Sequence, residues 1–241
     1  SKITGKTVLM ALGQAFFSLS IAVGVMMTYG AYLPKDVSLP KAAATVALAD
    51  TAVALLAGLA IFPVVFASGL APDSGPGLIF VTMPVALGQM PASILIATLF
   101  FVLLCFAAIT TGIGMLEPAV SWLEEHKGMK RPHMAVMTGI LCWALGLSSV
   151  LSFNIWSDVF PLGFIESFAE KTIFDLLDMT LANFLIPLGG LLIAIFAGWA
   201  MSRSSTIDEL GLGDGRLYRL WHFLIRYLAP LAVLMVFLSN I

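Results

Sequence analysis

The stretch that decides the fold is residues 8–32, VLMALGQAFFSLSIAVGVMMTYGAY. It is long enough to cross a bilayer, because about 20 apolar residues span the hydrocarbon layer. Its interior nevertheless contains an amide, hydroxyl groups and glycines, at Gly13, Gln14, Ser18, Ser20, Gly24 and Thr28. Such a mixture permits a break in the helix, which frees backbone carbonyls and helix ends to bind a small ion or a zwitterion. The alternative is a small-residue packing face whose hydroxyls bond the preceding turn.

Outside this stretch the chain remains apolar. Of its 241 residues, 60% are hydrophobic and 11% charged, with a mean hydropathy of +1.01, whereas a soluble domain carries roughly 25% charged residues. We therefore expect an all-α membrane protein of about six transmembrane helices, the first of them discontinuous, in a single transmembrane domain over residues 1–241. The expected spans are about 8–32, 42–67, 92–123, 134–153, 174–199 and 217–239. A shorter apolar stretch, broken by Pro84 and Gly88, predicts an extracellular lid at about 70–91.

The charges predict how the spans are oriented. The loops after the first, third and fifth spans contain Lys35, Lys41, Lys127, Lys130, Arg131, Arg203, Arg216 and Arg219. The N-terminal lead and the loops on the other side contain only Lys2, Lys6 and Lys171. Because cytoplasmic loops retain positive charge, both chain ends are predicted to lie outside the cytoplasm, in a multi-pass protein of the cell membrane.

Several function classes are excluded. The net charge of -2 shows no basic surplus, so we expect no nucleic-acid partner. The sequence contains no Walker loop and no zinc or haem ligand spacing. We therefore expect neither ATP-driven transport by this chain nor an enzyme, and the lipid bilayer is its expected environment.

Three further spans carry polar groups that deserve an explanation in a membrane. Asp50 lies early in an apolar helix, where its carboxylate needs sodium, a proton or a basic partner. Thr110 and Thr111 lie in mid-span and point about 100 degrees apart, so one can face an ion and the other a substrate. Their alternative is to bond their own backbone. Asp178, near the outer end of the fifth span, has a functional role or is an interfacial charge or a helix cap.

These residues resemble a known family. Residues 13–20 together with residues 28–32 are similar to the sixth transmembrane helix of the neurotransmitter:sodium symporters, which include bacterial amino-acid transporters of the leucine-transporter type. Later helices agree in order, through Ala57-Gly58 with Ile61-Phe62-Pro63, Phe80 to Pro91, Ala107 to Thr111 with Glu117-Pro118, Asp175 with Asp178, and Arg226-Tyr227 with Pro230. The resemblance implies the inverted-repeat sodium symporter fold, of which this chain would hold helices six to eleven.

The resemblance also implies two sodium sites in the complete transporter. Carried over by position, their ligands would be Ser18 and Asp50 in the first site, and Ala107, by its carbonyl, Thr110 and Thr111 in the second. Many relatives have asparagine where this sequence has Asp50, and Ala54 occupies the place of a chloride-coordinating serine. Because Asp50 supplies the negative charge that animal relatives take from chloride, we expect that chloride is not required.

The same resemblance implies a substrate pocket and two gates. The pocket would be lined by Phe17, Ser18, Ser20, Val23, Thr111 and Met115, with Phe17 closing over an amino acid. The cytoplasmic gate would contain Tyr32 and Glu125, and the extracellular gate Gln14 and Asp178. The small side chains at Val23 and Met115 favour a neutral substrate that is apolar or aromatic.

The expected function is therefore sodium-coupled symport of a neutral amino acid. In the family, the first helix supplies the other broken segment, so this chain should need a partner, the N-terminal half with helices one to five. The alternative is a non-transporting membrane scaffold or a degenerate half-transporter.

Overall fold

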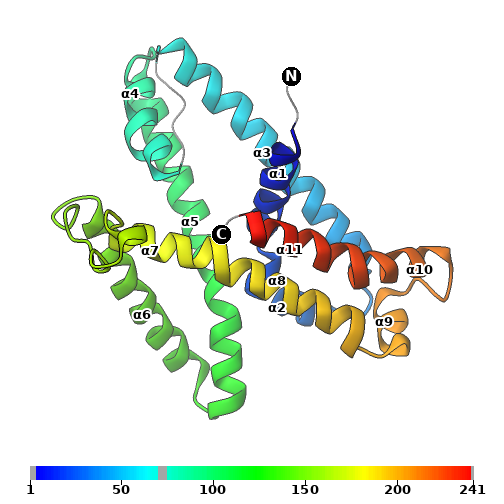
Figure 1. Ribbon diagram of the computed structural model, residues 1–241. Coiled ribbons are helices and arrows are strands. Elements are labelled where there is room, and N and C mark those ends of the chain that lie inside the picture. Colours follow the sequence, from blue (N-terminus) through cyan, green and yellow to red (C-terminus); the bar gives the residue numbers. More distant parts are fainter. Residues whose placement is uncertain (1–3, 70–74, 240–241) are drawn as a thin grey trace. The chain divides into compact units, whose positions relative to one another are not determined.

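The computed structural model describes residues 4–69 and 75–239, and all regular structure within these residues is helical (Figure 1). The expected all-α fold is confirmed. The chain divides into two compact units, a first unit made of Ser1–Pro40 and Met115–Ile241 and a second unit made of Lys41–Gly114. Helix α5, Ser93–Lys127, runs from the second unit into the first.

The first apolar segment is interrupted, as predicted. Helix α1 (Gly5–Ser18) ends where Ser20 adopts a left-handed conformation with φ of +50°. The short 3-10 turn η1 (Ile21–Val23) follows, and Gly24, with φ of +82°, opens the short helix α2 (Val25–Ala31). A left-handed residue cannot continue a right-handed helix, so these two positions separate α1 from α2.

The rest of the first unit consists of helices joined by turns and loops. Helix α6 covers Arg131–Ser152 and is followed by the short turn η3, Glu166–Phe168. A continuous helix then alternates between α and π geometry, through α7 (Ile173–Met179), η4 (Thr180–Leu185), α8 (Ile186–Ile195) and η5 (Phe196–Ala200). The last elements are α9 (Arg203–Leu210), α10 (Arg216–Phe223), η6 (Leu224–Leu228) and α11 (Ala229–Ser239). Helix α8 packs against both η1 and α11, so it supports the interrupted segment.

The second unit contains α3 (Leu39–Ala67), the short helix formed by η2 (Leu78–Thr82) and α4 (Met83–Gly88), and the start of α5. Val65 of α3 and Met83 and Leu87 of α4 form a buried apolar core, which Phe100 of α5 also contacts. Residues 78–88, within the expected lid, are therefore fixed to α3 and α5 by apolar packing. Residues 70–74 of that lid lie outside the described residues.

Two long helices begin three residues before the predicted spans, α3 at Leu39 and α6 at Arg131. Proline is the second residue of each, at Pro40 and Pro132. Proline suits the first turn of a helix, because the N–H that it lacks would have no partner there. Hydropathy marks only the apolar part of a helix and therefore misses this polar first turn.

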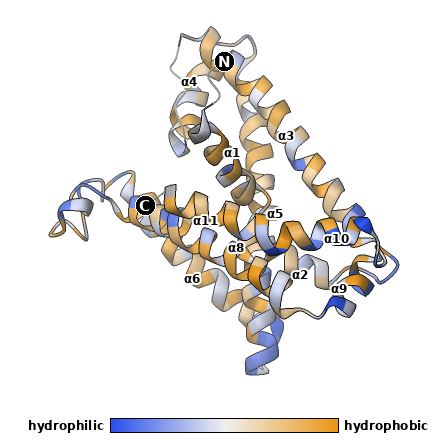
Figure 2. Cartoon of the chain, turned by 45° about the vertical axis from the view of Figure 1, so that its right-hand side comes forward, coloured by the Kyte–Doolittle hydropathy of each residue, from blue (hydrophilic) through white to orange (hydrophobic). Residues whose placement is uncertain are grey.

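Five helices among the described residues are long and apolar enough to cross a membrane: Leu39–Ala67, Ser93–Lys127, Arg131–Ser152, Ile173–Ala200 and Arg216–Leu238. Almost none of the apolar residues of the first two are buried within the chain. Figure 2 shows hydrophobic residues along the long helices and hydrophilic residues mainly at their ends and in the connections. Such a surface needs lipid or another polypeptide to cover it.

Candidate functional site

The interruption between α1 and α2 lies directly against a pair of glycines in α8. A Cβ added at Gly189 would lie 2.3 Å from the carbonyl oxygen of Ala22, and one added at Gly190 would lie 3.5 Å from the Ala22 Cβ. Ala22 and Val25 are both buried here. Only glycine at position 189 allows this approach of the two backbones. This contact was not predicted from the sequence, although two adjacent glycines in an apolar helix are a signal for close packing.

The interruption places two helix ends of opposite polarity next to each other in the chain. The last turn of α1 carries carbonyl groups at the negative end of its helix dipole, and the first turn of α2 presents N–H groups at its positive end. Four of the residues predicted to bind substrate or sodium belong to this segment, namely Phe17, Ser18, Ser20 and Val23. Phe17 is 55% exposed and Val23 43%, so both remain accessible from outside the first unit. This arrangement can bind a cation at one helix end and a carboxylate at the other.

One hydroxyl of this segment bonds the preceding turn, as expected for a segment that serves only in helix packing. The Thr28 hydroxyl donates to the carbonyl oxygen of Gly24 at 3.1 Å, and so bonds the preceding turn. This bond satisfies a carbonyl at the start of α2 and stabilises the short helix after the interruption.

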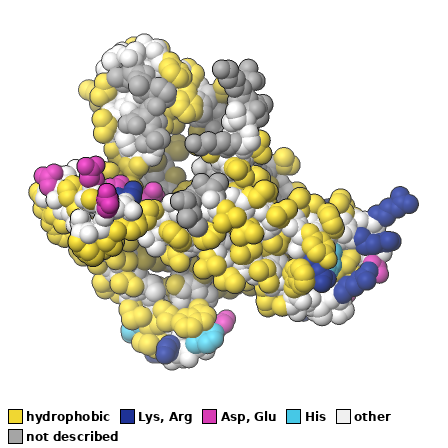
Figure 3. All heavy atoms as spheres, viewed as in Figure 1, with side chains coloured by type: hydrophobic (Ala, Val, Ile, Leu, Met, Phe, Trp, Pro, Cys, Tyr) yellow, Lys and Arg dark blue, Asp and Glu magenta, His cyan; other side chains and the backbone are white. Residues whose placement is uncertain are grey.

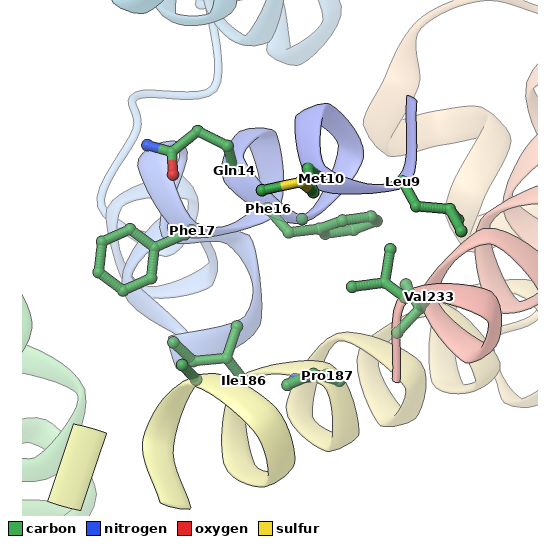
Figure 4. Close-up of a pocket in the computed structure, with 11 residues that line it drawn as sticks. Leu9, Met10, Gln14, Phe16, Phe17, Ile186, Pro187 and Val233 are labelled. Atoms are coloured by element: carbon green, nitrogen blue, oxygen red, sulfur yellow. The ribbon is translucent and has the colours of Figure 1, made fainter. Parts of the chain in front are cut away.

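A cavity of about 580 Å³ lies beside α1 in the first unit (Figure 4). Its walls come from α1, from η4 and α8, and from α11, through Leu9, Met10, Gly13, Gln14, Phe16, Phe17, Ala182, Ile186, Pro187, Val233 and Val236. Figure 4 shows Phe16 and Phe17 pointing in different directions from α1. Gln14 is the one polar side chain of this lining. The cavity can hold an apolar group, but it offers no charged side chain to the ends of an amino acid.

Asp50 and the threonine pair belong to the second unit. Asp50 is half-buried on α3 and is not without an interaction partner. The Thr110 hydroxyl donates to the carbonyl oxygens of Phe106 and Ala107, both at 3.0 Å. Thr110 therefore bonds the backbone of its own helix, which was the alternative to a role in ion binding. A hydroxyl that donates its proton in this way keeps its lone pairs, so its oxygen can still coordinate a cation. Thr111 and Ala107 are exposed on the same helix.

Carboxylate and imidazole clusters play no part in these candidate sites. Within residues 4–69 and 75–239, no group of three His, Cys, Asp or Glu side chains is placed to hold a metal ion.

Tyr32, at the end of α2, is connected to α5 and α6 through a carboxylate. Its hydroxyl donates to Oε1 of Glu117 at 2.7 Å, and the guanidinium of Arg131 forms an ion pair with the same oxygen. Glu124 also lies near this arginine, with 4.0 Å between Oε2 and Nη1. Glu125, predicted beside Tyr32 in a gate, is exposed. Sequence reasoning gave Glu117 no role, although a carboxylate before a proline in an apolar helix was a signal for one.

The N-terminus of α7 is capped by Thr172 and Asp175, which form a capping box. The Asp175 carboxylate accepts the Thr172 N–H at 2.9 Å, and the Thr172 hydroxyl accepts the Asp175 N–H at 3.3 Å. Asp178, three residues further along, is exposed. Of the two alternatives to a functional role for Asp178, the helix cap is therefore excluded and an interfacial charge remains.

Met115, the last of the predicted pocket residues, is 45% exposed on α5.

Known proteins resemble this chain over nearly its whole length. Residues 2–241 match the sodium:neurotransmitter symporter family. The chain is 38% identical to the uncharacterized sodium-dependent transporter YhdH of Bacillus subtilis (strain 168), over 99% of this chain and 52% of the relative. It is 33% identical to an uncharacterized sodium-dependent transporter of Haemophilus influenzae, over 100% of this chain and 51% of the relative.

A solved structure agrees with these relatives. The crystal structure of MhsT in complex with L-phenylalanine superposes with a TM-score of 0.86 at 38% identity, covering 98% of this chain and 52% of that one. The expected sodium symporter fold is thereby confirmed for the part that the chain covers. The chain spans about half the length of the curated relatives that it matches.

Proposed function

This chain belongs to the sodium:neurotransmitter symporter family, and from that premise we propose that it takes part in sodium-coupled symport of a neutral amino acid. It would act as the C-terminal part of a transporter that an N-terminal half completes. Family membership makes it part of a multi-pass membrane transporter and not an enzyme. The resemblance to MhsT, whose crystal structure contains L-phenylalanine, supports a neutral and aromatic substrate.

The observation that carries the proposal is the interruption at Ser20 and Gly24, held against Gly189. An apolar helix that merely anchored a scaffold would gain nothing from two left-handed residues in mid-span, since each leaves backbone groups without helical partners. Those groups have a use when an ion and a zwitterion bind between the two helix ends. The interruption therefore favours transport over the scaffold alternative.

Two sodium ions would bind in the complete transporter. Ser18 and Asp50 would serve the first ion, and the Ala107 carbonyl, Thr110 and Thr111 the second. The substrate pocket would be lined by Phe17, Ser18, Ser20, Val23, Thr111 and Met115, so that Ser18 and Thr111 serve both an ion and the substrate. Sodium and substrate would share ligands, so each would stabilise the state that the other prefers, which is the physical origin of coupling.

We also propose two gates beside the substrate pocket and an orientation of the chain in the membrane. Tyr32 and Glu125 would belong to the cytoplasmic gate, and Gln14 and Asp178 to the extracellular gate, with residues 70–91 as a lid. Both ends of the chain would lie outside the cytoplasm, as the positions of lysine and arginine predict.

The direct test coexpresses the chain with an N-terminal half that bears helices one to five and reconstitutes both in proteoliposomes. We expect uptake of labelled L-phenylalanine driven by an inward sodium gradient, and none from either half alone. Correct assembly shown by copurification, together with a complete lack of sodium-dependent uptake of phenylalanine and other neutral amino acids, would favour the scaffold.

A matched pair of threonines tests the second sodium site. Thr98 and Thr110 both lie on α5, and each hydroxyl donates to the carbonyl four residues earlier. Thr110→Val should raise the sodium concentration for half-maximal uptake by about tenfold, because the ion loses an oxygen ligand. Thr98→Val should leave that concentration unchanged. Equal effects of the two substitutions would remove Thr110 from the site.

A further inference from the structure

Arg226 lies in the last apolar helix, within the π turn η6, and its position is fixed by contacts with η5. A Cβ added at Gly198 would lie 2.9 Å from the Arg226 Cα, so the two backbones touch. The guanidinium carbon lies 4.3 Å from the centre of the Trp199 ring, and the Trp199 indole N–H donates to the Arg226 carbonyl at 3.2 Å. A ring at this distance holds the cation by its π face.

Within the described residues, Arg226 contacts the aromatic rings of Trp199 and Tyr227 but has no carboxylate partner. Its Nε atom is buried and has no hydrogen-bond partner, and none of the carboxylates within residues 4–69 and 75–239 forms a salt bridge with it. Asp214, the acidic residue that precedes α10, is paired with Arg203 at 2.5 Å. A buried cationic donor without a partner is costly in an apolar segment, so the arrangement calls for an anion from outside the chain.

Two exposed arginines extend this site along the same helix. Arg216 and Arg219 lie on α10, three residues apart and therefore one turn from each other, and Arg219 precedes Arg226 by seven residues in the same continuous helix. Tyr218, with 1% exposure, anchors α10 through a hydrogen bond of 2.8 Å with the Thr206 hydroxyl. Figure 3 shows Lys and Arg side chains gathered at the end of the first unit where α9 and α10 lie.

Helix α11, which follows η6 in the chain, carries exposed leucines. Leu231, Leu234 and Leu238 of α11 are 54%, 40% and 63% exposed. A ligand that covers both regions must have an anionic end for the guanidinium groups and long apolar chains for α11. A soluble anion or an acidic peptide would leave the leucines uncovered, whereas a phospholipid satisfies both regions.

We propose that Arg226, together with Arg219 and Arg216, binds the phosphate of an anionic phospholipid whose acyl chains lie along α11. The fork of Arg226 donates hydrogen bonds to the phosphate while Trp199 supports its other face, and the two exposed arginines add charge attraction. None of these three arginines is among the residues proposed to bind sodium or the amino acid.

The test titrates the purified, delipidated chain in detergent with phosphatidylglycerol and follows bound lipid by native mass spectrometry. We expect one phosphatidylglycerol to bind at least about tenfold more tightly than phosphatidylcholine, whose headgroup has no net charge. Arg226→Gln should weaken phosphatidylglycerol binding by about tenfold, and Arg219→Gln by about fivefold. Arg226→Lys, which keeps the charge and loses the fork, should retain part of the affinity.

Matched controls keep the proposal falsifiable. Arg203→Gln removes an arginine that already has a carboxylate partner, so it should leave lipid binding unchanged. If Arg226→Gln does not fold, Arg219→Gln still tests the site, because Arg219 is exposed. Equal binding of the two lipids, or wild-type binding by both glutamine variants, would overturn the proposal. Release of the lipid by excess inorganic phosphate would overturn it as well, because the site would then bind free phosphate.

Discussion

The hydroxyl of Tyr32 and the carboxylate of Glu117 form a hydrogen bond of 2.7 Å across a separation of 85 residues in the sequence. The bond joins the end of α2 to α5, and Arg131 at the start of α6 binds the same carboxylate oxygen. Only 15% of the Glu117 side chain is exposed, so water competes little for it. Three helices therefore meet at one carboxylate, directly beyond the interrupted segment.

Tyr32→Phe tests this bond alone, because it removes the hydroxyl and keeps the ring. We expect a loss of about 1 kcal/mol in the free energy of unfolding, which is typical of one hydrogen bond. The thermal unfolding midpoint in detergent should fall by about 2–4 °C. Tyr29→Phe, which alters an exposed tyrosine one turn earlier on α2, is the control. The same fall in both variants would show that the Glu117 bond contributes nothing special.

Gly189→Ala should displace the interrupted segment. The added methyl group would lie 2.3 Å from the Ala22 carbonyl oxygen, which belongs to the backbone and cannot rotate away. We expect a destabilisation of about 1–3 kcal/mol, measured as a lower unfolding midpoint, together with loss of uptake by the complete transporter. Gly190→Ala is the matched control, since its methyl group would meet Ala22 and Val233 only at 3.5–3.9 Å. A stable and active Gly189→Ala variant would contradict the close approach.

Gly24→Ala and Gly30→Ala should shift stability in opposite directions. Gly24 has φ of +82°, and an added Cβ would meet only Pro118, at 3.8 Å. Alanine would therefore destabilise the protein through its unfavourable left-handed backbone conformation and not through a clash. We expect about 1 kcal/mol of destabilisation at this position. Gly30 lies within α2 with open space around an added Cβ, so alanine should stabilise the helix by about 0.5–1 kcal/mol. Thermal unfolding of the two variants decides this prediction, and a Gly24→Ala variant as stable as wild type would contradict it.

The interruption of the first segment could be predicted from sequence, because glycine and hydroxyl residues in mid-span are local signals. The α8 surface that supports the interruption could not be predicted from sequence. Contact between Ala22 and Gly189 joins residues far apart in the chain, and two adjacent glycines do not reveal which backbone approaches them. The π turns could not be predicted either, because these helices are apolar on nearly all sides, so a rotation of the face by one inserted residue leaves no signal in the sequence.

Local hydrogen bonds of polar side chains could likewise be predicted from sequence, whereas partners from distant helices could not. Thr110 bonds its own backbone, as a membrane threonine does by local geometry alone. Tyr32 and Arg131 share Glu117, and only tertiary structure could select that residue over Glu125. Resemblance to a family supplied candidate roles for thirteen residues from Gln14 to Asp178, and those roles remain predictions.

Asp50 should make transport independent of chloride. A carboxylate beside a bound cation supplies the balancing charge that an anion would otherwise provide, and Ala54, one turn later on α3, offers no hydroxyl to a chloride ion. Sodium-driven uptake by the complete transporter should therefore persist when gluconate replaces chloride, and a collapse of uptake would contradict this prediction. Asp50→Asn should reduce sodium affinity by about tenfold, because the charge is lost, whereas Asp36→Asn in an exposed turn should not. Adding Ala54→Ser to Asp50→Asn should restore uptake in chloride and not in gluconate, since the serine can then hold the anion that the carboxylate had replaced.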